Sequence, residues 1–252
     1  MTIFSHSGDL GDIIYSLPTI RAAGGGILKL FNFPGRTAHG MTEAKVERVK
    51  PLLECQPYIE KVEWTTEFCD SDLNGFRNHR AHGNLADMHL ATHGFSWHER
   101  QTPWLSEIKR IRAPKVIISK TPRYENPNFN WRAVVEKYGK DIGFIGDPQE
   151  HGFFCEAYGE VAYTEARNLL AIAELIFSCS LFIGNPSLPA AIAEGLKHRM
   201  ILVNCPGSNQ HLAVFERWDC MIAWGNKIEL PCLSIPKAYI TNPTRFSYEQ
   251  GT

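Results

Sequence analysis

Hydrophobic positions along this chain follow two spacings, and the two alternate. Short apolar runs typical of buried strands are followed by segments in which apolar residues return every three or four positions, as on one face of a helix. Strands that alternate with helices favour a parallel sheet with right-handed crossovers. The predicted first half is strand 1–4, a helix containing Ile13 and Leu17, strand 27–31, helix 41–55 and strand 59–64.

The same alternation begins again near residue 113, after a less regular stretch that holds a short predicted helix at 85–93. We therefore predict an α/β protein with a GT-B-like arrangement, two Rossmann-like β/α/β domains facing a central cleft. The first domain spans 1–112 and the second 113–230, and an extended tail at 231–252 is free to cross back over the first. In the second domain the predicted strands are 115–118, 142–145, 181–183 and 200–204, and the predicted helices are 131–138, 169–177 and 190–196.

Composition narrows the class of protein. The 252 residues carry a formal net charge of −1, which gives no bulk electrostatic case for a nucleic-acid or anionic-membrane partner. No apolar run reaches the roughly 18 residues of a membrane span, and the first residues lack the pattern of a signal peptide. The seven cysteines show no C-x-x-C spacing, so we expect neither structural zinc nor a disulfide framework. These features favour a cytoplasmic protein without an integral membrane segment.

The turn after the first predicted strand carries the most informative chemistry. Gly8 and Gly11 permit a tight turn and a close approach of the backbone to a ligand, and the helix that follows offers free N–H groups to an anion. Asp9 and Asp12 leave two interpretations open: an N-cap or first-turn carboxylate, or a catalytic base that faces a cleft. Pro18 lies inside the apolar pattern, so we expect a kink unless the helix starts late.

Two similar turns follow predicted strands of the second half, at residues 146–151 and 184–189. Ligands of open α/β sheets bind at the carboxyl ends of the strands, where such turns lie. Two halves that present these ends to each other form a cleft, which is a common place for a small molecule to bind. The sequence therefore predicts a site assembled from turns of both halves.

Basic residues and histidines gather in the less regular stretch. Arg77, Arg80 and His82 are candidates for contact with an acceptor or a phosphate, although an ordinary polar loop explains them equally well. His89 and His93 are four residues apart on a predicted helix, a spacing that can hold a metal. The glutamate of an H-E-x-x-H motif is absent, and no third ligand is suitably spaced. We expect no metal site and assign these histidines to the surface or a substrate pocket.

Three motifs in order carry a resemblance to a known family. Residues 11–18, GDIIYSLP, resemble the N-terminal Gly-Asp…Leu-Pro motif of the heptosyltransferase-like glycosyltransferases, called glycosyltransferase family 9. Residues 131–150 are similar to that family's strand and following glutamate, and residues 171–189 look like its Gly-Asn-Asp segment. The order and spacing of the motifs match over roughly residues 1–30 and 113–210.

The resemblance implies a GT-B enzyme that transfers a sugar from a nucleotide-diphosphate sugar to an acceptor hydroxyl, with inversion and without a required metal or other cofactor. Asp12 matches the proposed general base, which needs only hydrogen-bond reach to the hydroxyl, and Asp9 is the alternative base. Glu150 matches the residue expected to hold the nucleotide ribose, and Ser187 the residue that receives the donor diphosphate at a helix N-terminus. The other residues expected at the donor site are Gly8, Gly11, Arg123, Gly146, Asn185 and Leu188.

Two departures from the family's pattern keep alternatives open. Pro186 and Ala191 stand where the family usually has aspartate and histidine, side chains that would face the donor. One alternative is therefore a nucleotide- or nucleotide-sugar-binding protein that has lost transfer. Another is a glycosyltransferase that acts on DNA or nucleotide acceptors through the basic loop; glycan, lipid-linked sugar and nucleic acid all stay open as acceptors. A Rossmann oxidoreductase is disfavoured, because no G-x-G-x-x-G follows the first strand.

Overall fold

Two parallel sheets organise the chain, which confirms the predicted α/β class. The computed structural model describes residues 2–33, 40–66, 71–78, 84–205, 217–223, 225 and 230–233. In this part of the chain the first sheet has the strand order β3-β2-β1-β4, and all its pairs are parallel. Its strands are β1 (Thr2–His6), β2 (Gly26–Leu30), β3 (Ile59–Trp64) and β4 (Ser71–Asp72).

The second sheet is larger, with the order β10-β9-β8-β5-β6-β7, and its strands are parallel as well. Its first strand in the sequence, β5, lies in the interior of the sheet. The chain then adds strands on one side of β5 before it returns to the other side. The strands are β5 (Val116–Ser119), β6 (Ile142–Phe144), β7 (Ala162–Tyr163), β8 (Leu181–Gly184), β9 (Met200–Val203) and β10 (Cys220–Ala223).

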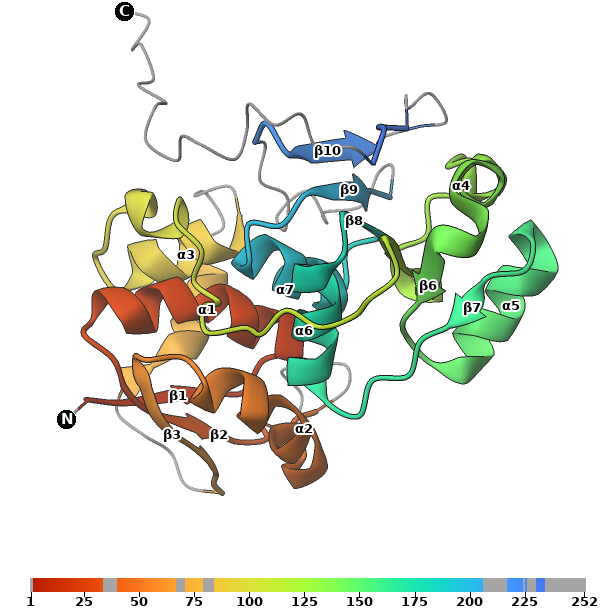
Figure 1. Cartoon of the computed structure of the whole chain (residues 1–252). Coiled ribbons are helices and arrows are strands. Elements are labelled where there is room, and N and C mark those ends of the chain that lie inside the picture. Colours follow the sequence, from red (N-terminus) through yellow and green to blue (C-terminus); the bar gives the residue numbers. More distant parts are fainter. Residues whose placement is uncertain are drawn as a thin grey trace, which may run out of the picture.

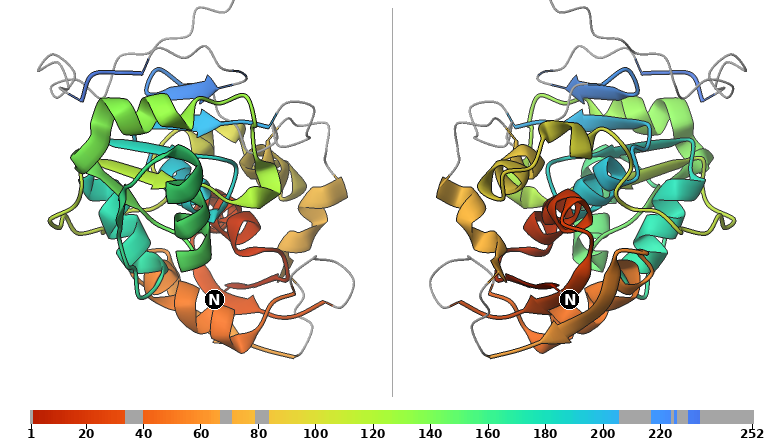
Figure 2. Two further views of the ribbon diagram at one scale, coloured as in Figure 1. Left: turned by 90° about the vertical axis from the view of Figure 1, so that its right-hand side faces the viewer. Right: turned by 90° about the vertical axis from the view of Figure 1, so that its left-hand side faces the viewer.

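Helices connect the strands, and some of them lie between the two sheets (Figure 1). Helix α1 of the first half contacts α7 of the second, and α2 contacts α6, so four helices form a layer shared by both halves. Figure 2 shows this layer from two further sides, with the first sheet below it and the second above. The helices are α1 (Leu10–Ala22), α2 (Glu43–Glu54), α3 (Leu85–Thr92), α4 (Trp131–Tyr138), α5 (Pro148–Tyr158), α6 (Leu169–Ser178) and α7 (Leu188–Gly195).

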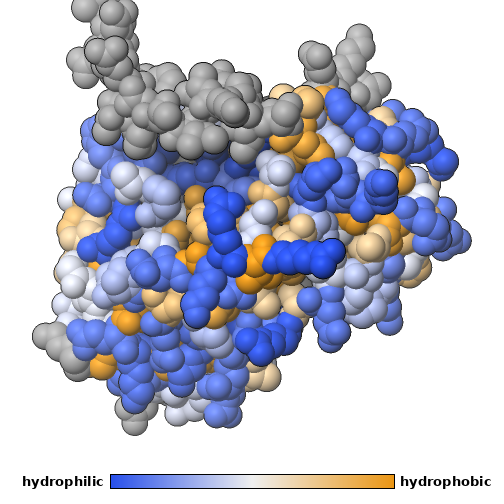
Figure 3. Space-filling model, in the orientation of Figure 1, coloured by the Kyte–Doolittle hydropathy of each residue, from blue (hydrophilic) through white to orange (hydrophobic). Residues whose placement is uncertain are grey.

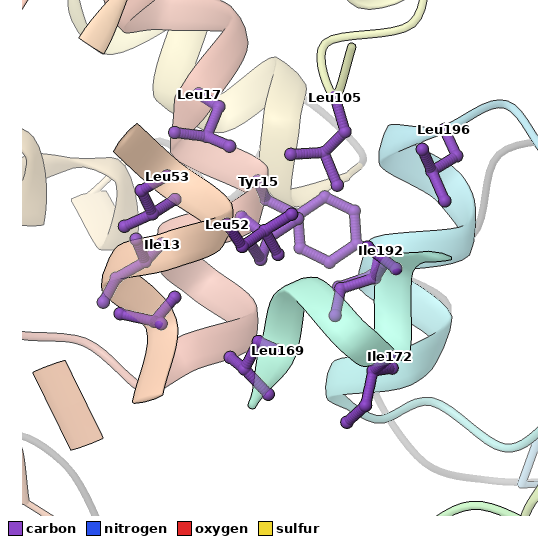
Figure 4. Packing of buried hydrophobic residues seen from close by; sticks show 14 of the residues in the cluster. Ile13, Tyr15, Leu17, Leu52, Leu53, Leu105, Leu169, Ile172, Ile192 and Leu196 are labelled. Carbon is purple, nitrogen blue, oxygen red and sulfur yellow. The ribbon is translucent and has the colours of Figure 1, made fainter. Parts of the chain in front are cut away.

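One hydrophobic core runs through this shared layer. Figure 4 shows Tyr15 of α1, Leu52 of α2 and Ile192 of α7 directed toward one another, with Leu105 beside them. Strand β5 divides its side chains between this core and a second one, because successive residues of a strand point to opposite faces. Ile117 packs into the shared core, whereas its neighbours Val116 and Ile118 pack beneath α4 and α5.

The segment between the halves is anchored to both of them. Trp104 is fully buried, and its backbone N–H donates to the Gly195 carbonyl at the end of α7, at 3.0 Å. Its own carbonyl accepts the Tyr58 hydroxyl from the first half. The Arg21 guanidinium, at the end of α1, donates to the Pro103 carbonyl at 2.6 Å. Figure 3 shows the face that this segment crosses as mainly hydrophilic, with hydrophobic residues gathered near its middle.

Most predicted elements are confirmed to within two residues, whereas the strands β4, β7 and β10 were not predicted. Helices α1 and α7 each contain a proline. Helix α1 continues from Leu10 to Ala22 through the buried Pro18, although this residue cannot donate a helical hydrogen bond. Helix α7 begins at Leu188, two residues earlier than predicted. Pro189 fits there because the first turn of a helix needs no N–H from it.

The structure tests the remaining sequence predictions only in part. Residues 234–252 lie outside the described residues, so the course of the tail stays a prediction. The tail begins on the second half, where the Tyr138 hydroxyl donates to the Pro231 carbonyl at 2.6 Å and Arg199 Nη1 to the Cys232 carbonyl at 3.2 Å. Within the described ranges, no helix is long and apolar enough to cross a membrane. In those ranges Cys55, Cys155 and Cys179 are free thiols.

Candidate active site at the two switch points

Each sheet has one point where the chain reverses its direction of growth, and the predicted residues follow the strands at these points. In the first sheet β1 lies between β2 and β4, and in the second β5 lies between β6 and β8. Ligands of open α/β sheets bind outside the carboxyl ends of the strands at such points. Residues 7–12 and 73–78 follow β1 and β4, whereas residues 120–124 and 185–188 follow β5 and β8.

Asp12 and Arg77 form the central ion pair of the first half. Arg77 Nη2 donates to Asp12 Oδ2 at 2.8 Å, and the guanidinium also stacks on the Phe76 ring, 4.4 Å from its centroid. Asp12 lies in the first turn of α1, and Arg77 lies on a 3-10 helix, Leu73–Asn78, that follows β4. The predicted phosphate contact Arg77 is therefore directed at the predicted base.

The surroundings of the Asp12 carboxyl raise its pKa. Burial raises its pKa to about 6, the Arg77 charge opposes the rise, and the nearby Asp9 charge adds to it. The Asp9 backbone N–H also donates to the carboxylate, which favours the charged form. A general base is most effective when its pKa lies near the working pH, so the environment of Asp12 suits proton abstraction better than that of an exposed carboxylate.

The ion pair leads to a first prediction. Arg77→Met removes the charge that opposes burial, so the pKa of Asp12 should rise above about 6. Arg77→Lys should hold it closer to its original value, because the positive charge remains. A ¹³C NMR titration of the Asp12 carboxyl checks this. A pKa that stays the same or falls in the methionine variant would contradict the assignment of Arg77 as the main counter-charge.

Gly8 is needed because two side chains occupy the space beside it. A Cβ on Gly8 would lie 2.4 Å from His6 Cε1 and 2.9 Å from Asp12 Oδ2, closer than atoms of this kind approach. The Gly8 N–H donates to His6 Nδ1 at 2.8 Å. The loop is fixed further by Ser7, whose N–H and hydroxyl both donate to Asn74 Oδ1, at 3.0 and 2.8 Å.

The two glycines of this turn should respond differently to substitution. Gly8→Ala must displace the His6 ring or the Asp12 carboxylate, so we expect a destabilisation of about 1–3 kcal/mol. A Cβ on Gly11 meets nothing within 4 Å. Gly11→Ala should therefore leave the free energy of unfolding within about 1 kcal/mol of the original, on the stabilising side. Urea unfolding of both variants measures the contrast, and equal costs would refute it.

Asp9 and Arg123 bring the two halves of the predicted site together. Asp9 is the N-cap residue of α1 by position, yet its side chain makes no capping hydrogen bond. Its Oδ2 instead lies 3.7 Å from Nη1 of Arg123, which lies on the 3-10 helix Pro122–Tyr124 after β5. A residue of the second switch point thus reaches the first. Both side chains are partly exposed, so this pair adds little stability.

Asn185 joins the strand ends of the second switch point. Its amide accepts from the Thr121 N–H at 3.1 Å and donates to the Thr121 carbonyl at 2.8 Å. The side chain is buried and connects the ends of β5 and β8. Its role in donor binding stays a prediction. In the structure its side chain holds the loop after β5, which carries Arg123.

Ser187 is the N-cap residue of α7 but does not cap it. Its hydroxyl makes no capping hydrogen bond, and among the described residues its buried Oγ has no partner. Leu188 begins the helix and is partly packed against the shared core. The first amides of a helix lack internal acceptors and attract anions. The polar groups at this helix start are therefore suited to a phosphate.

Glu150 and Gly146 lie after β6, next to the second switch point. Gly146 has φ +149° and would place a Cβ 2.9 Å from Glu150 Oε2. That same oxygen accepts the Asp147 N–H at 3.2 Å in a capping box. Burial raises the pKa of Glu150, while Lys120 lowers it. The ribose contact predicted for Glu150 stays a prediction, and it would have to share the carboxylate with the helix cap.

Several expectations about side chains around the site need correction. Ala191 was expected to face the donor, but it is 1% exposed within the shared core, so a missing histidine there removes no donor contact. Pro186 is buried as well. His89 is neither a surface nor a pocket residue, because it is fully buried and stacked on Phe76 at 4.0 Å between ring centroids. Arg80 and His82 lie outside the described residues.

Sequence analysis did not identify three residues that lie near the site. His6 and Asn74 hold the Gly8 turn, and Lys120 pairs with Glu125 at 2.8 Å directly after β5. His6 ends a predicted strand at the carboxyl edge of the sheet, and this position was the only sequence signal for it. Among the described residues, no cluster of histidine, cysteine and acidic side chains is arranged to hold a metal.

Comparisons with known proteins give matches only among solved structures. No model of a protein family matches the sequence, and no curated protein matches it. E. coli heptosyltransferase WaaC with ADP-2-deoxy-2-fluoro heptose is 11% identical with a TM-score of 0.56, and the match covers 88% of this chain and 92% of that one. A glycosyl transferase family 9 protein from Veillonella parvula DSM 2008 is 14% identical with a TM-score of 0.52, covering 87% and 84%.

A third similar structure is the iron-containing dodecameric glycosyltransferase TibC from enterotoxigenic E. coli H10407. It is 17% identical with a TM-score of 0.54, and the match covers 91% of this chain and 62% of that one. Sequence identities this low carry information about the fold alone. At that level they agree with the resemblance drawn from the three motifs, and the chain has the GT-B fold of the family 9 heptosyltransferases.

Proposed function

We propose that this chain is an inverting glycosyltransferase that moves a sugar from a nucleotide-diphosphate sugar to an acceptor hydroxyl. The observation that carries the proposal is the ion pair between Asp9 and Arg123, because it joins the turn that holds the predicted base to a turn of the predicted donor site. The fold shared with heptosyltransferases supports the same activity, and one of these structures contains an ADP-heptose analogue. An ADP-activated sugar is therefore the first donor to test.

Asp12 is the base in this proposal. Its carboxylate takes the proton of the acceptor hydroxyl while that oxygen forms a bond to the anomeric carbon. The bond from this carbon to the donor diphosphate breaks on the opposite side, which inverts the configuration. Only one carboxylate is needed for such a single displacement, and the raised pKa of Asp12 supports its choice over the more exposed Asp9.

The leaving diphosphate would be received by the second half. Ser187 Oγ and the first amides of α7 supply hydrogen-bond donors. Arg123 supplies a positive charge when it leaves its ion pair with Asp9 and pairs with the phosphate instead. These groups stabilise the charge that develops on the leaving group, which is the task a metal performs in other enzymes. We therefore propose that the transfer needs no metal. Iron is the metal to test, because the similar structure TibC contains iron. If a chelator abolished activity and iron restored it, the proposal of metal-free transfer would be wrong.

The two alternatives receive less support. A protein that has lost transfer was suggested by Pro186 and Ala191, but the burial of Ala191 removes half of that argument. A nucleic-acid acceptor was suggested by the basic loop. Of its residues, Arg77 is directed at Asp12. Arg100, a further basic residue near this stretch, pairs with Asp87 at 2.5 Å.

Thermal unfolding with a panel of nucleotides and nucleotide sugars tests the proposal. A ligand at about 100 times its Kd adds about 2.7 kcal/mol of stability, which raises the Tm of a chain of this size by roughly 5–10 °C. We expect a shift with an ADP-sugar and a smaller one after Ser187→Ala. No shift with any sugar nucleotide would count against the proposal, and a shift without any transfer to a set of acceptors would favour the binding protein.

A further inference from the structure

His6 is fixed next to the proposed base but has no place in the reaction described above. It is the last residue of β1, fully buried, and its ring lies 5.9 Å from that of Phe76 and 5.3 Å from that of His89, between centroids. Its Nδ1 accepts the Gly8 N–H at 2.8 Å. Because Nδ1 is the acceptor, the proton of the neutral ring is on Nε2.

The amide that donates to His6 directly precedes one that donates to Asp12. The next amide along the chain, of Asp9, already donates to the Asp12 carboxylate. The Asp12 Oδ2 atom also lies 2.9 Å from the position a Cβ would take on Gly8, so the Gly8 backbone and the carboxylate are neighbours. With His6 removed, the neighbouring Asp12 carboxylate is the acceptor to which we expect the Gly8 N–H to turn.

We propose that His6 is a positioning residue: by accepting the Gly8 N–H, it keeps this donor away from the Asp12 carboxylate and leaves an oxygen lone pair free for an acceptor hydroxyl. The inference rests on the proposed role of Asp12 as the base. A carboxylate that is held by an additional backbone donor is a weaker base, because hydrogen bonds to the charged form stabilise it. His6 therefore preserves basicity without touching the reacting atoms.

Histidine suits this task because it stays neutral here. Burial, together with the Arg77 charge, lowers the pKa of His6 to about 3, so the ring remains an acceptor over the whole working range. The other groups facing Asp12 act in known directions. Arg77 lowers its pKa, and the Asp9 charge raises it. Arg123 acts on Asp9, its ion-pair partner, from the second half.

The pKa of the Asp12 carboxyl, measured by ¹³C NMR, tests the inference, with the signal assigned through Asp12→Asn. His6→Leu removes the acceptor at similar volume. We expect the pKa of Asp12 to fall by about one unit, a tenfold increase in its acid dissociation constant. His6→Asn places an amide oxygen two residues before Gly8, as in an Asx-turn, and should restore the original value. If His6→Leu does not fold, His6→Met makes the same removal.

Ser7→Ala is the matched control. It removes the hydroxyl bond to Asn74, at 2.8 Å, in the same loop but leaves the Gly8 N–H bound to His6. Its Asp12 pKa should not change. An unchanged pKa in the leucine or methionine variant, or the same fall in the alanine control, would overturn the inference.

The titration needs neither donor nor acceptor, so its failure is distinct from failure of the proposed function. If transfer is detected, the acidic limb of the kcat/KM profile should move down in pH with His6→Leu and return with His6→Asn. A purely structural role would change Tm and leave this limb in place.

Discussion

Asp12→Asn should lower kcat/KM for sugar transfer by about 10²–10⁴-fold, the range that general-base catalysis supplies. The asparagine keeps the shape of the side chain and an oxygen for the Arg77 hydrogen bond, now 2.8 Å long, but cannot take a proton. Donor affinity should remain close to the original, because Asp12 acts on the acceptor hydroxyl. Steady-state kinetics with the donor identified by thermal unfolding, together with its binding constant, gives both quantities.

Stability separates this loss from unfolding. The pKa of Asp12 is raised from 3.8 to about 6, so the folded protein binds the proton more tightly than the unfolded chain. The contribution of Asp12 to the stability of the folded protein therefore decreases as pH rises through this interval. Asparagine resembles the protonated carboxyl, and the variant should be at least as stable as the original protein at pH 8. A variant that transfers sugar at the original rate would remove Asp12 as the base.

Asp9→Asn decides between the two carboxylates. Asp9 is more exposed and makes its ion pair with Arg123 rather than with the residues around Asp12. We expect a smaller fall in kcat/KM than for Asp12→Asn, and no loss of donor affinity, because Arg123 no longer has to exchange Asp9 for the phosphate. The reverse order of the two losses would identify Asp9 as the base.

Glu194→Gln should cost about 2–3 kcal/mol of unfolding free energy, because it removes a buried charge that pairs with two cations, while Arg217 keeps its second partner, Asp219. Glu194 is 2% exposed at the end of α7. Arg217 Nε lies 3.1 Å from its Oε2, and Lys197 Nζ pairs with Oε1. The Lys197 ammonium also lies 4.3 Å from the centroid of the Trp104 ring, in the segment between the halves. Removing the carboxylate charge exposes both cations to each other.

Urea unfolding measures this cost, and an exposed ion pair gives the matched control. Asp141 lies 3.2 Å from Lys115, with the lysine side chain 62% exposed. Asp141→Asn should cost no more than about 1 kcal/mol, because water screens the pair. If Glu194→Gln were equally mild, the remaining pair of Arg217 with Asp219 would be sufficient, and Glu194 would not fasten α7 to the connecting segment.

The shared helix layer explains why the two halves are difficult to separate on the sequence alone. The alternation of strands and helices predicts most elements of each half, though not β4, β7 and β10, because periodicity is a local property of a segment. Which helix face meets which partner is not local: α1 ends at Ala22 and α7 begins only at Leu188, yet the two helices are in contact. The proposed boundaries at 112 and 230 therefore stay a prediction about a chain whose core is continuous.

The sequence by itself determined the α/β class, the positions of the turns and the carboxylates within them. Apolar periodicity and glycine-rich turns act within a few residues, and the three ordered motifs supplied the fold family. Only the tertiary structure decided the partners: Arg77 reaches Asp12 across 65 positions, and Asn185 reaches Thr121 across 64. It also decided that Ala191 is buried. Such contacts depend on which strand ends the sheet order brings together, and no local pattern in the chain specifies that order.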